Sequence, residues 1–207
     1  MIALESLLSR KPWLITPDAL SVMASQAVAF FDGRTSLPEK QTNPLLSVEQ
    51  GVGVIALQGP LMRHPDLFSR ILFDATDMEQ AIQAIEEAVT RPDIKAVLLD
   101  IDSPGGTVNG TPELAQAVAD ATKSKPVYAF SAGQMCSAAY WVASQCDAIY
   151  ATPSARIGSI GVLLPVVDSS EALKNQGLKV EVFAAGKFKS AGTPGVSLTD
   201  DQRTLIQ

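Results

Sequence analysis

The residues best suited to chemistry lie in three loops, each directly after a predicted strand. These loops contain DSPGG at 102–106, MCSAAYW at 135–141 and GKFKSAG at 186–192. In α/β sheets, ligands bind at the carboxyl ends of the strands. We therefore treat the three loops as candidates for one shared site.

The glycine pair Gly105 and Gly106 follows the apolar run AVLLDID. Glycines lack the Cβ atoms that block close approach, so their backbone N–H groups can point at an oxygen that becomes negative during a reaction. A plain turn explains the same Pro-Gly-Gly sequence. The pair by itself leaves both interpretations open.

Ser137 opens a predicted helix and is followed by the small residues Ala138 and Ala139. Unpaired N–H groups and the positive end of the helix dipole would lie beside its hydroxyl, which suits a nucleophile and an oxyanion. A serine that only caps the helix has the same sequence pattern. Cys136 is a second candidate nucleophile, although a free cysteine there is more typical of a small buried side chain.

A serine nucleophile needs a base, and the chain has one histidine, His64, far from the other motifs in sequence. We interpret His64 as a loop residue, so a Ser-His-Asp triad is not expected. Lys187 and Lys189 in the third loop can supply a base if the neutral form of one of them is accessible. Two solvated loop lysines are the alternative.

The composition limits the classes of function. The chain has 207 residues, 46% hydrophobic content and a formal net charge of -6, which favour a globular enzyme domain and disfavour nucleic-acid binding. We find no export signal and no membrane anchor, and two cysteines in such a chain suggest reduced thiols. A cytoplasmic protein with protein partners is expected.

The sequence pattern of the rest of the chain predicts strands that alternate with helices. A helix is predicted at 17–31 and a polar linker at 32–50, so residues 1–50 form an N-terminal arm and residues 51–207 the main domain. Apolar strands are predicted in GVGVIALQGPL, AVLLDID, PVYAF, AIYA and KVEVFAA, the first buried on both faces. This alternation predicts an α/β fold with a mostly parallel sheet.

The ordered motifs DSPGG, MCSAAYW, IGSIGV and GKFKSAG resemble the signal peptide peptidase A family of Ser-Lys serine peptidases. The resemblance runs from about residue 51 to residue 191. It implies a Clp protease/crotonase-like α/β fold, built from repeated β-β-α units with flanking helices. It also implies endopeptidase activity on protein substrates bound in extended form.

Carried over to this sequence, the resemblance implies Ser137 as nucleophile, Lys189 as base and Ser159 as a supporting hydroxyl. The Gly105/Gly106 amide and the Ala138 amide would form the oxyanion hole. No cofactor and no metal are implied. A homo-oligomer with the active site near a subunit boundary is implied. Ala138-Ala139 replaces the glycine pair usual in the family, which could narrow the substrate range.

The opening KPWLITPDAL resembles the leader of the phage prohead peptidases, which indicates capsid or scaffold maturation in the host cytoplasm. Because the chain stops 18 residues after Lys189, we expect a domain truncated at its C-terminal end. Two alternatives remain open. One is a crotonase-type acyl-CoA enzyme, and the other is a non-catalytic capsid assembly or scaffold protein.

Overall fold

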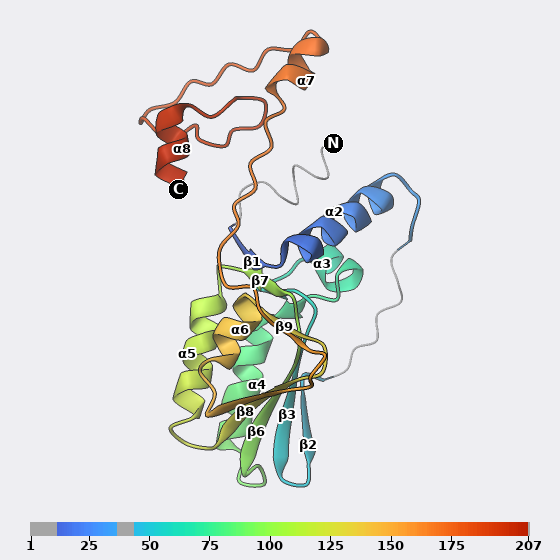
Figure 1. Cartoon of the computed structure of the whole chain (residues 1–207), viewed down its shortest axis with the longest axis vertical. Coiled ribbons are helices and arrows are strands. Elements are labelled where there is room, and N and C mark those ends of the chain that lie inside the picture. Colours follow the sequence, from blue (N-terminus) through green and yellow to red (C-terminus); the bar gives the residue numbers. More distant parts are fainter. Residues whose placement is uncertain (1–11, 37–43, 207) are drawn as a thin grey trace. The chain divides into compact units, whose positions relative to one another are not determined.

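The computed structural model describes residues 12–36 and 44–206. The chain forms two compact units, one spanning Pro12–Leu163 and the other including Leu164–Gln207 (Figure 1). Each unit is described by itself. The arm at 1–50 and the peptidase domain at 51–207 remain a prediction.

The larger unit contains the strands and most of the helices. Its strands are β1 (Trp13–Ile15), β2 (Leu46–Glu49), β3 (Val52–Gln58), β4 (Leu61–Met62), β5 (Thr76–Asp77), β6 (Ala96–Asp102), β7 (Gly105–Thr107), β8 (Val127–Ser131), β9 (Gln134–Cys136), β10 (Ala148–Ala151) and β11 (Arg156–Gly158). Its helices are α2 (Pro17–Phe31), α3 (Leu67–Leu72), α4 (Met78–Thr90), α5 (Thr111–Ala121) and α6 (Ala138–Ala143).

The main sheet has the strand order β10-β8-β6-β3-β2. All its neighbours are parallel except β2, which runs antiparallel to β3. Each long parallel strand is followed by a short one that leaves this sheet, and the short strands form the sheets β1-β7-β4-β5 and β11-β9. Because α5 and α6 follow two of these strand pairs directly, the predicted α/β fold with repeated β-β-α units is confirmed.

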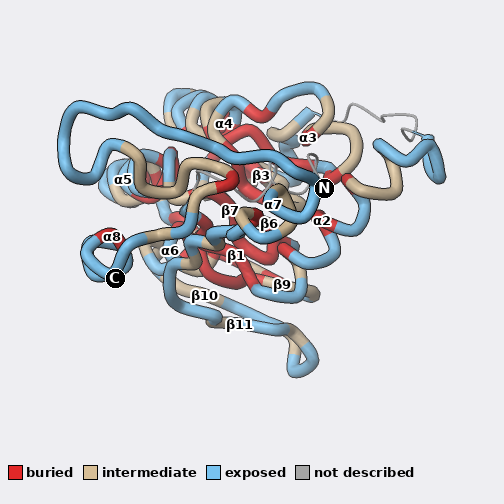
Figure 2. Tube along the Cα trace, turned by 90° about the horizontal axis from the view of Figure 1, so that it is seen from above, coloured by how far each residue is buried: buried red, intermediate tan, exposed pale blue. Residues whose placement is uncertain are grey.

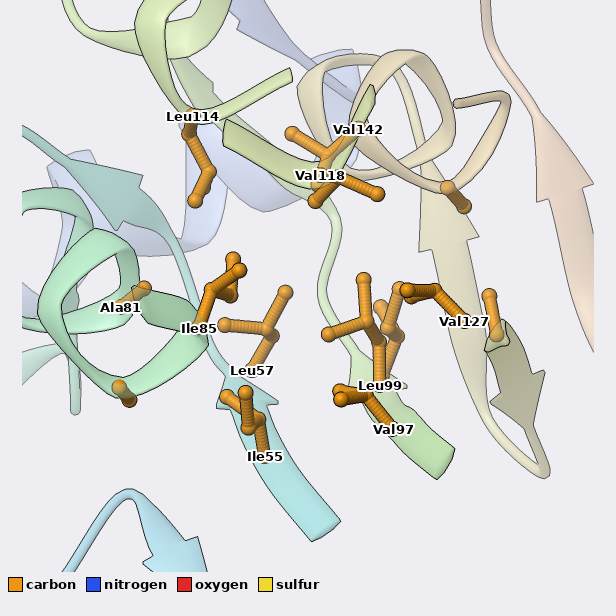
Figure 3. Close-up of a cluster of buried hydrophobic side chains, with 14 of the residues drawn as sticks. Ile55, Leu57, Ala81, Ile85, Val97, Leu99, Leu114, Val118, Val127 and Val142 are labelled. Atoms are coloured by element: carbon orange, nitrogen blue, oxygen red, sulfur yellow. The ribbon is translucent and has the colours of Figure 1, made fainter. Parts of the chain in front are cut away.

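The core lies between the main sheet and helices α4, α5 and α6 (Figure 3). Ile55 and Leu57 of β3 and Leu99 of β6 are fully buried there, together with Ile85 of α4. Burial alternates along β3, so its other face is only half-buried. The expectation that this strand is buried on both faces is therefore wrong, since the core helices pack against one face.

The predicted helix at 17–31 is confirmed as α2, with Thr16 as its N-cap. The aromatic rings of Phe30 and Phe31 at its C-terminal end pack on Phe68 of α3, with centroid distances of 5.2 and 5.6 Å. The polar stretch 32–50 differs from the prediction, because it contains the edge strand β2. Residues 37–43 of that stretch lie outside the described residues.

The smaller unit contains α7 (Ser170–Asn175) and α8 (Asp200–Ile206). The predicted strand at 179–185 is wrong, since this segment adopts no regular structure and Phe183 is 94% exposed. A strand needs a partner edge, and the described part of this unit offers no other strand. Throughout residues 12–36 and 44–206, no helix has the length and apolar character needed to cross a membrane.

Candidate active site

Ser137 lies at the turn from β9 into α6 with φ +54° and ψ -114°. A positive φ is uncommon for a residue other than glycine and stores backbone strain, which is often found at functional sites. The Ser137 side chain makes no capping hydrogen bond to α6, and its hydroxyl lies 3.4 Å from the carbonyl oxygen of Gly161. The capping interpretation is therefore not supported.

Two hydrogen bonds hold this strained turn. The backbone N–H of Ser137 donates to the carbonyl oxygen of Gly158 at 2.7 Å, and the N–H of Trp141 donates to the carbonyl oxygen of Ser137 at 2.9 Å. Parallel pairing of β9 with β11 extends up to this point, where Cys136 lies opposite Gly158. Ser137 is thus fixed between a strand pair and a helix start.

The glycine loop is attached to the same turn. The N–H of Ser103 donates to the carbonyl oxygen of Gln134 at 2.7 Å, and the N–H of Cys136 donates to that of Ser103 at 3.0 Å. Because Ser103 immediately precedes Pro104 and the glycine pair, these bonds bring the pair toward Ser137 and Ala138. Four predicted site residues therefore gather at one end of the larger unit.

The two glycines are required by close backbone approaches. A Cβ atom on Gly105 would lie 2.1 Å from the carbonyl oxygen of Leu14, and one on Gly106 would lie 1.8 Å from that of Leu61. Gly105 also has φ +113°, which favours glycine. The N–H of Gly105 donates to the Ser103 hydroxyl at 3.2 Å. The glycine pair is thus packed closely between β1 and β4 in the sheet β1-β7-β4-β5 and is not a plain surface turn.

Ser159 follows Gly158 directly, so it lies one residue beyond the carbonyl that accepts the Ser137 N–H bond. It also has a positive φ, +54°, and it is exposed. Its position beside the Ser137 turn agrees with a supporting role, which remains a prediction.

Lys189 belongs to the smaller unit, so the structure describes it separately from Ser137. Its backbone N–H donates to the carbonyl oxygen of Gly186 at 3.2 Å. The neighbouring Lys187 forms an exposed ion pair with Asp201, with an Nζ–Oδ2 distance of 2.7 Å. The Ser137–Lys189 pairing stays a prediction, and Lys187 already has an acidic partner.

Cys136 and His64 show no features of catalytic groups. Cys136 is fully buried, its thiol donates to the carbonyl oxygen of Arg156 at 3.3 Å, and burial raises its pKa. A protonated buried thiol is a poor nucleophile. His64 is an exposed residue in the turn after β4, which agrees with its interpretation as a loop residue.

Sequence reasoning missed two features beside the site. Strand β1 pairs with β7 and so lies against the glycine pair, and all three of its residues are buried (Figure 2). The second feature is an open cavity of about 460 Å³, lined by α2 and by Gly59, Pro104 and Gln134. The available signal was the apolar Trp13-Leu14-Ile15 run between two prolines, which is too short to define a strand by its pattern.

A serine held at a strained strand-to-helix turn of an α/β fold is the arrangement that hydrolases use to present a nucleophile. Residues 119–207 match the model described as peptidase family S49. This match to a peptidase family confirms the resemblance to peptidases that the motifs predict.

Two relatives extend the similarity over most of the chain. Capsid assembly protease C of Escherichia phage lambda is 28% identical over 193 residues, which cover 93% of this chain and 43% of the relative. Head-tail preconnector protein GP5 of Enterobacteria phage P21 is 29% identical over 197 residues, which cover 91% of this chain and 39% of the relative. The chain therefore spans about two-fifths of the length of these relatives.

Among solved structures, an enoyl-CoA hydratase/isomerase family member is 20% identical, with a TM-score of 0.43. The superposition covers 58% of this chain and 53% of that chain. A likeness this weak carries no argument about activity.

Proposed function

We propose that this chain carries the catalytic residues of a serine endopeptidase with Ser137 as nucleophile and Lys189 as base. The single observation that carries the proposal is the strained Ser137 turn, hydrogen-bonded on the Gly158 side and joined through Ser103 to a glycine loop. The match of residues 119–207 to peptidase family S49 supports the same reaction class.

In the proposed reaction, neutral Lys189 takes the proton of the Ser137 hydroxyl while Oγ attacks the carbonyl carbon of a peptide bond. The carbonyl oxygen becomes negative and is stabilised by the backbone N–H groups of Gly106 and Ala138, since the Gly105 N–H already donates to the Ser103 hydroxyl. The tetrahedral species collapses, the C–N bond breaks, and the protonated lysine gives its proton to the leaving amine. Water then attacks the ester and gives a proton to Lys189, which passes it to Ser137 Oγ as the C–O bond breaks and the acid product leaves.

Ser159 is proposed to orient the Lys189 amine through its hydroxyl, because it lies beside the Ser137 turn. The protein substrate is proposed to be a phage capsid or scaffold protein, since one relative is named a capsid assembly protease. From the family resemblance we also propose a homo-oligomer, in which Lys189 approaches Ser137 at a subunit boundary.

Labelling with a fluorophosphonate tests the nucleophile directly. We expect labelling of the wild-type protein and of Ser144→Ala, which changes an exposed serine at the end of α6. Ser137→Ala should lose both labelling and peptide hydrolysis while it keeps its thermal unfolding midpoint. Absence of labelling in the wild type would favour a non-catalytic assembly protein, and turnover of acyl-CoA would favour the crotonase-type alternative.

A further inference from the structure

Strand β1 runs between the two chain segments that border the proposed site. It pairs antiparallel with β7, with Trp13 opposite Thr107, Leu14 opposite Gly106 and Ile15 opposite Gly105 (Figure 1). On its other side, Trp13 and Leu163 exchange two backbone hydrogen bonds, each 2.8 Å long. Strand β1 thus lies between β7 and an isolated bridge to Leu163, two residues after the Gly161 carbonyl oxygen that lies 3.4 Å from the Ser137 hydroxyl.

The hydrogen-bond pattern shows which groups of the glycine loop face β1. The N–H of Thr16 donates to the carbonyl oxygen of Pro104 at 3.0 Å, and the N–H of Val108 donates to that of Pro12 at 3.2 Å. Because hydrogen-bonded pairs alternate along an antiparallel ladder, the Leu14–Gly106 pair is also of the hydrogen-bonded type. The Gly106 amide therefore faces β1, and the Gly105 amide is bonded to Ser103.

We propose that β1 occupies the slot in which an extended peptide substrate binds, so that residues 13–15 compete with the substrate inside the same molecule. This inference rests on the proposed peptidase function. The opposite edge of β7 is taken by β4, where Leu61 pairs with Gly106. A substrate that is to reach the loop amides as an added strand has only the edge that β1 covers.

The direction of β1 suits this role. Its chain runs from Trp13, opposite Thr107, to Ile15, opposite Gly105, so its carboxyl end approaches the glycine pair. A substrate with the same direction would bring the carbonyl group of its residue opposite Gly106 to the Gly106 amide, one of the proposed oxyanion donors. The β1 backbone thus imitates the acyl side of a bound peptide.

Strand β1 is not part of the main core. Its three residues are outside the main cluster of buried residues formed by the sheet and helices α4, α5 and α6. The indole N–H of Trp13 is buried and has no hydrogen-bond partner among the described residues. Because an unpaired buried donor is unfavourable, a peptide with an apolar side chain in place of Trp13 avoids this cost.

The slot also defines the chemistry of the peptide it accepts. Trp13, Leu14 and Ile15 are 2%, 5% and 2% exposed, so side chains pointing to both sides of the strand are buried. Charged side chains at these positions would be desolvated without partners. The slot therefore selects extended, uncharged, apolar segments of the protein substrate.

A reversible crosslink across β1 and β7 tests the competition. Trp13 and Thr107 form a pair without direct hydrogen bonds, in which Cα atoms lie about 4.5 Å apart, a separation that a disulfide can span. In full-length W13C/T107C, fluorophosphonate labelling of Ser137 should be at least about tenfold slower after oxidation than after reduction, because the competent fraction falls. T107C alone, oxidised in the same way, should show no difference.

A second measurement does not depend on catalysis. In W141F, Trp13 is the one remaining tryptophan. Acetyl-Pro-Phe-Leu-Ile-Thr-amide should displace β1 and shift the Trp13 emission to longer wavelength, with saturation. The control peptide acetyl-Pro-Phe-Glu-Glu-Thr-amide, which has charges at the positions of Leu14 and Ile15, should produce no shift.

The outcomes separate the two proposals. Equal labelling of oxidised and reduced W13C/T107C would overturn the competition while the proposed nucleophile stands. A saturable emission shift without labelling in any form would support the slot and overturn the peptidase proposal. No shift with the apolar peptide at millimolar concentration would overturn the slot.

Discussion

The backbone N–H of Ser137 donates a 2.7 Å hydrogen bond to the carbonyl oxygen of Gly158. This bond ties the turn that carries the proposed nucleophile to the residue immediately before Ser159. It also explains how a serine with positive φ stays in place, because surrounding contacts must fix a strained residue. The separation of Ser137 from Ser159 is therefore set by backbone bonding.

Lys189→Ala should lower kcat/KM for a peptide substrate by about 10²–10⁴, the usual contribution of a positioned base. The matched control is Lys187→Ala, two residues away. Its amine already pairs with Asp201 on the surface, so its removal should leave turnover nearly unchanged. Steady-state kinetics on both variants checks this, and equal losses would contradict the choice of Lys189.

Both cysteines should be alkylated slowly by iodoacetamide in the native protein at pH 8. Burial raises the pKa of Cys146 to about 12 and also raises the pKa of Cys136, so little thiolate is present. Mass spectrometry of native and urea-unfolded samples measures the two rates. Fast native alkylation of Cys136 with loss of activity would make Cys136 the better nucleophile.

Asp18→Asn should weaken the attachment of α2 in a pH-dependent way. Hydrogen bonds from Arg156, at 2.7 and 3.1 Å, hold the pKa of the Asp18 carboxyl well below its usual range. The stabilisation is therefore complete above the unfolded value of about 3.9 and declines as pH falls toward the folded value. It should be small, because the pair is exposed.

The measurement is the thermal unfolding midpoint of wild type and Asp18→Asn between pH 3 and pH 6. The difference should be largest near pH 6 and shrink below about pH 4. Asp32→Asn, an exposed aspartate just after α2, controls for the loss of one negative charge. A difference that grows on acidification would show that the pair does not act as described.

Leu99→Ala should lower the free energy of unfolding by about 2–5 kcal/mol, because Leu99 is fully buried between the sheet and its helices. Leu67→Ala removes the same atoms from a side chain that is 69% exposed, so its effect should stay within about 0.5 kcal/mol. Urea denaturation of both variants gives the comparison. A similar loss of unfolding free energy in both variants would show that Leu99 is not part of the core.

The sequence predicted the parts of the fold that local pattern determines. Strands β3, β6, β8 and β10 are apolar runs, and α2 starts at a Thr-Pro pair, so both kinds of element carry their own signal. Strand β2 was missed because three of its four residues are exposed and show no apolar period. The strand predicted at 179–185 failed for the opposite reason, since strand propensity does not supply a partner.

In the candidate site, too, the residues with a local sequence pattern were predicted and the long-range contacts were not. Ser137 and the glycine pair could be predicted because they stand in loops after recognisable strands. The contact of Leu14 with Gly106 could not be, because it joins residues far apart in the chain through backbone bonds that no side-chain pattern records. The pairing of Ser137 with Lys189 rests on the family resemblance and on the experiments above.

The chain order of the two units has a consequence for synthesis. The larger unit, Pro12–Leu163, holds the whole sheet and its core, and its last residue is translated before Lys189. Since domains generally fold as they leave the ribosome, the unit with Ser137 can reach its native form while the proposed base is still unmade. A nascent chain would then present a folded Ser137 turn before its own Lys189 is translated, so its own lysine could act as a base only after translation has passed the third loop.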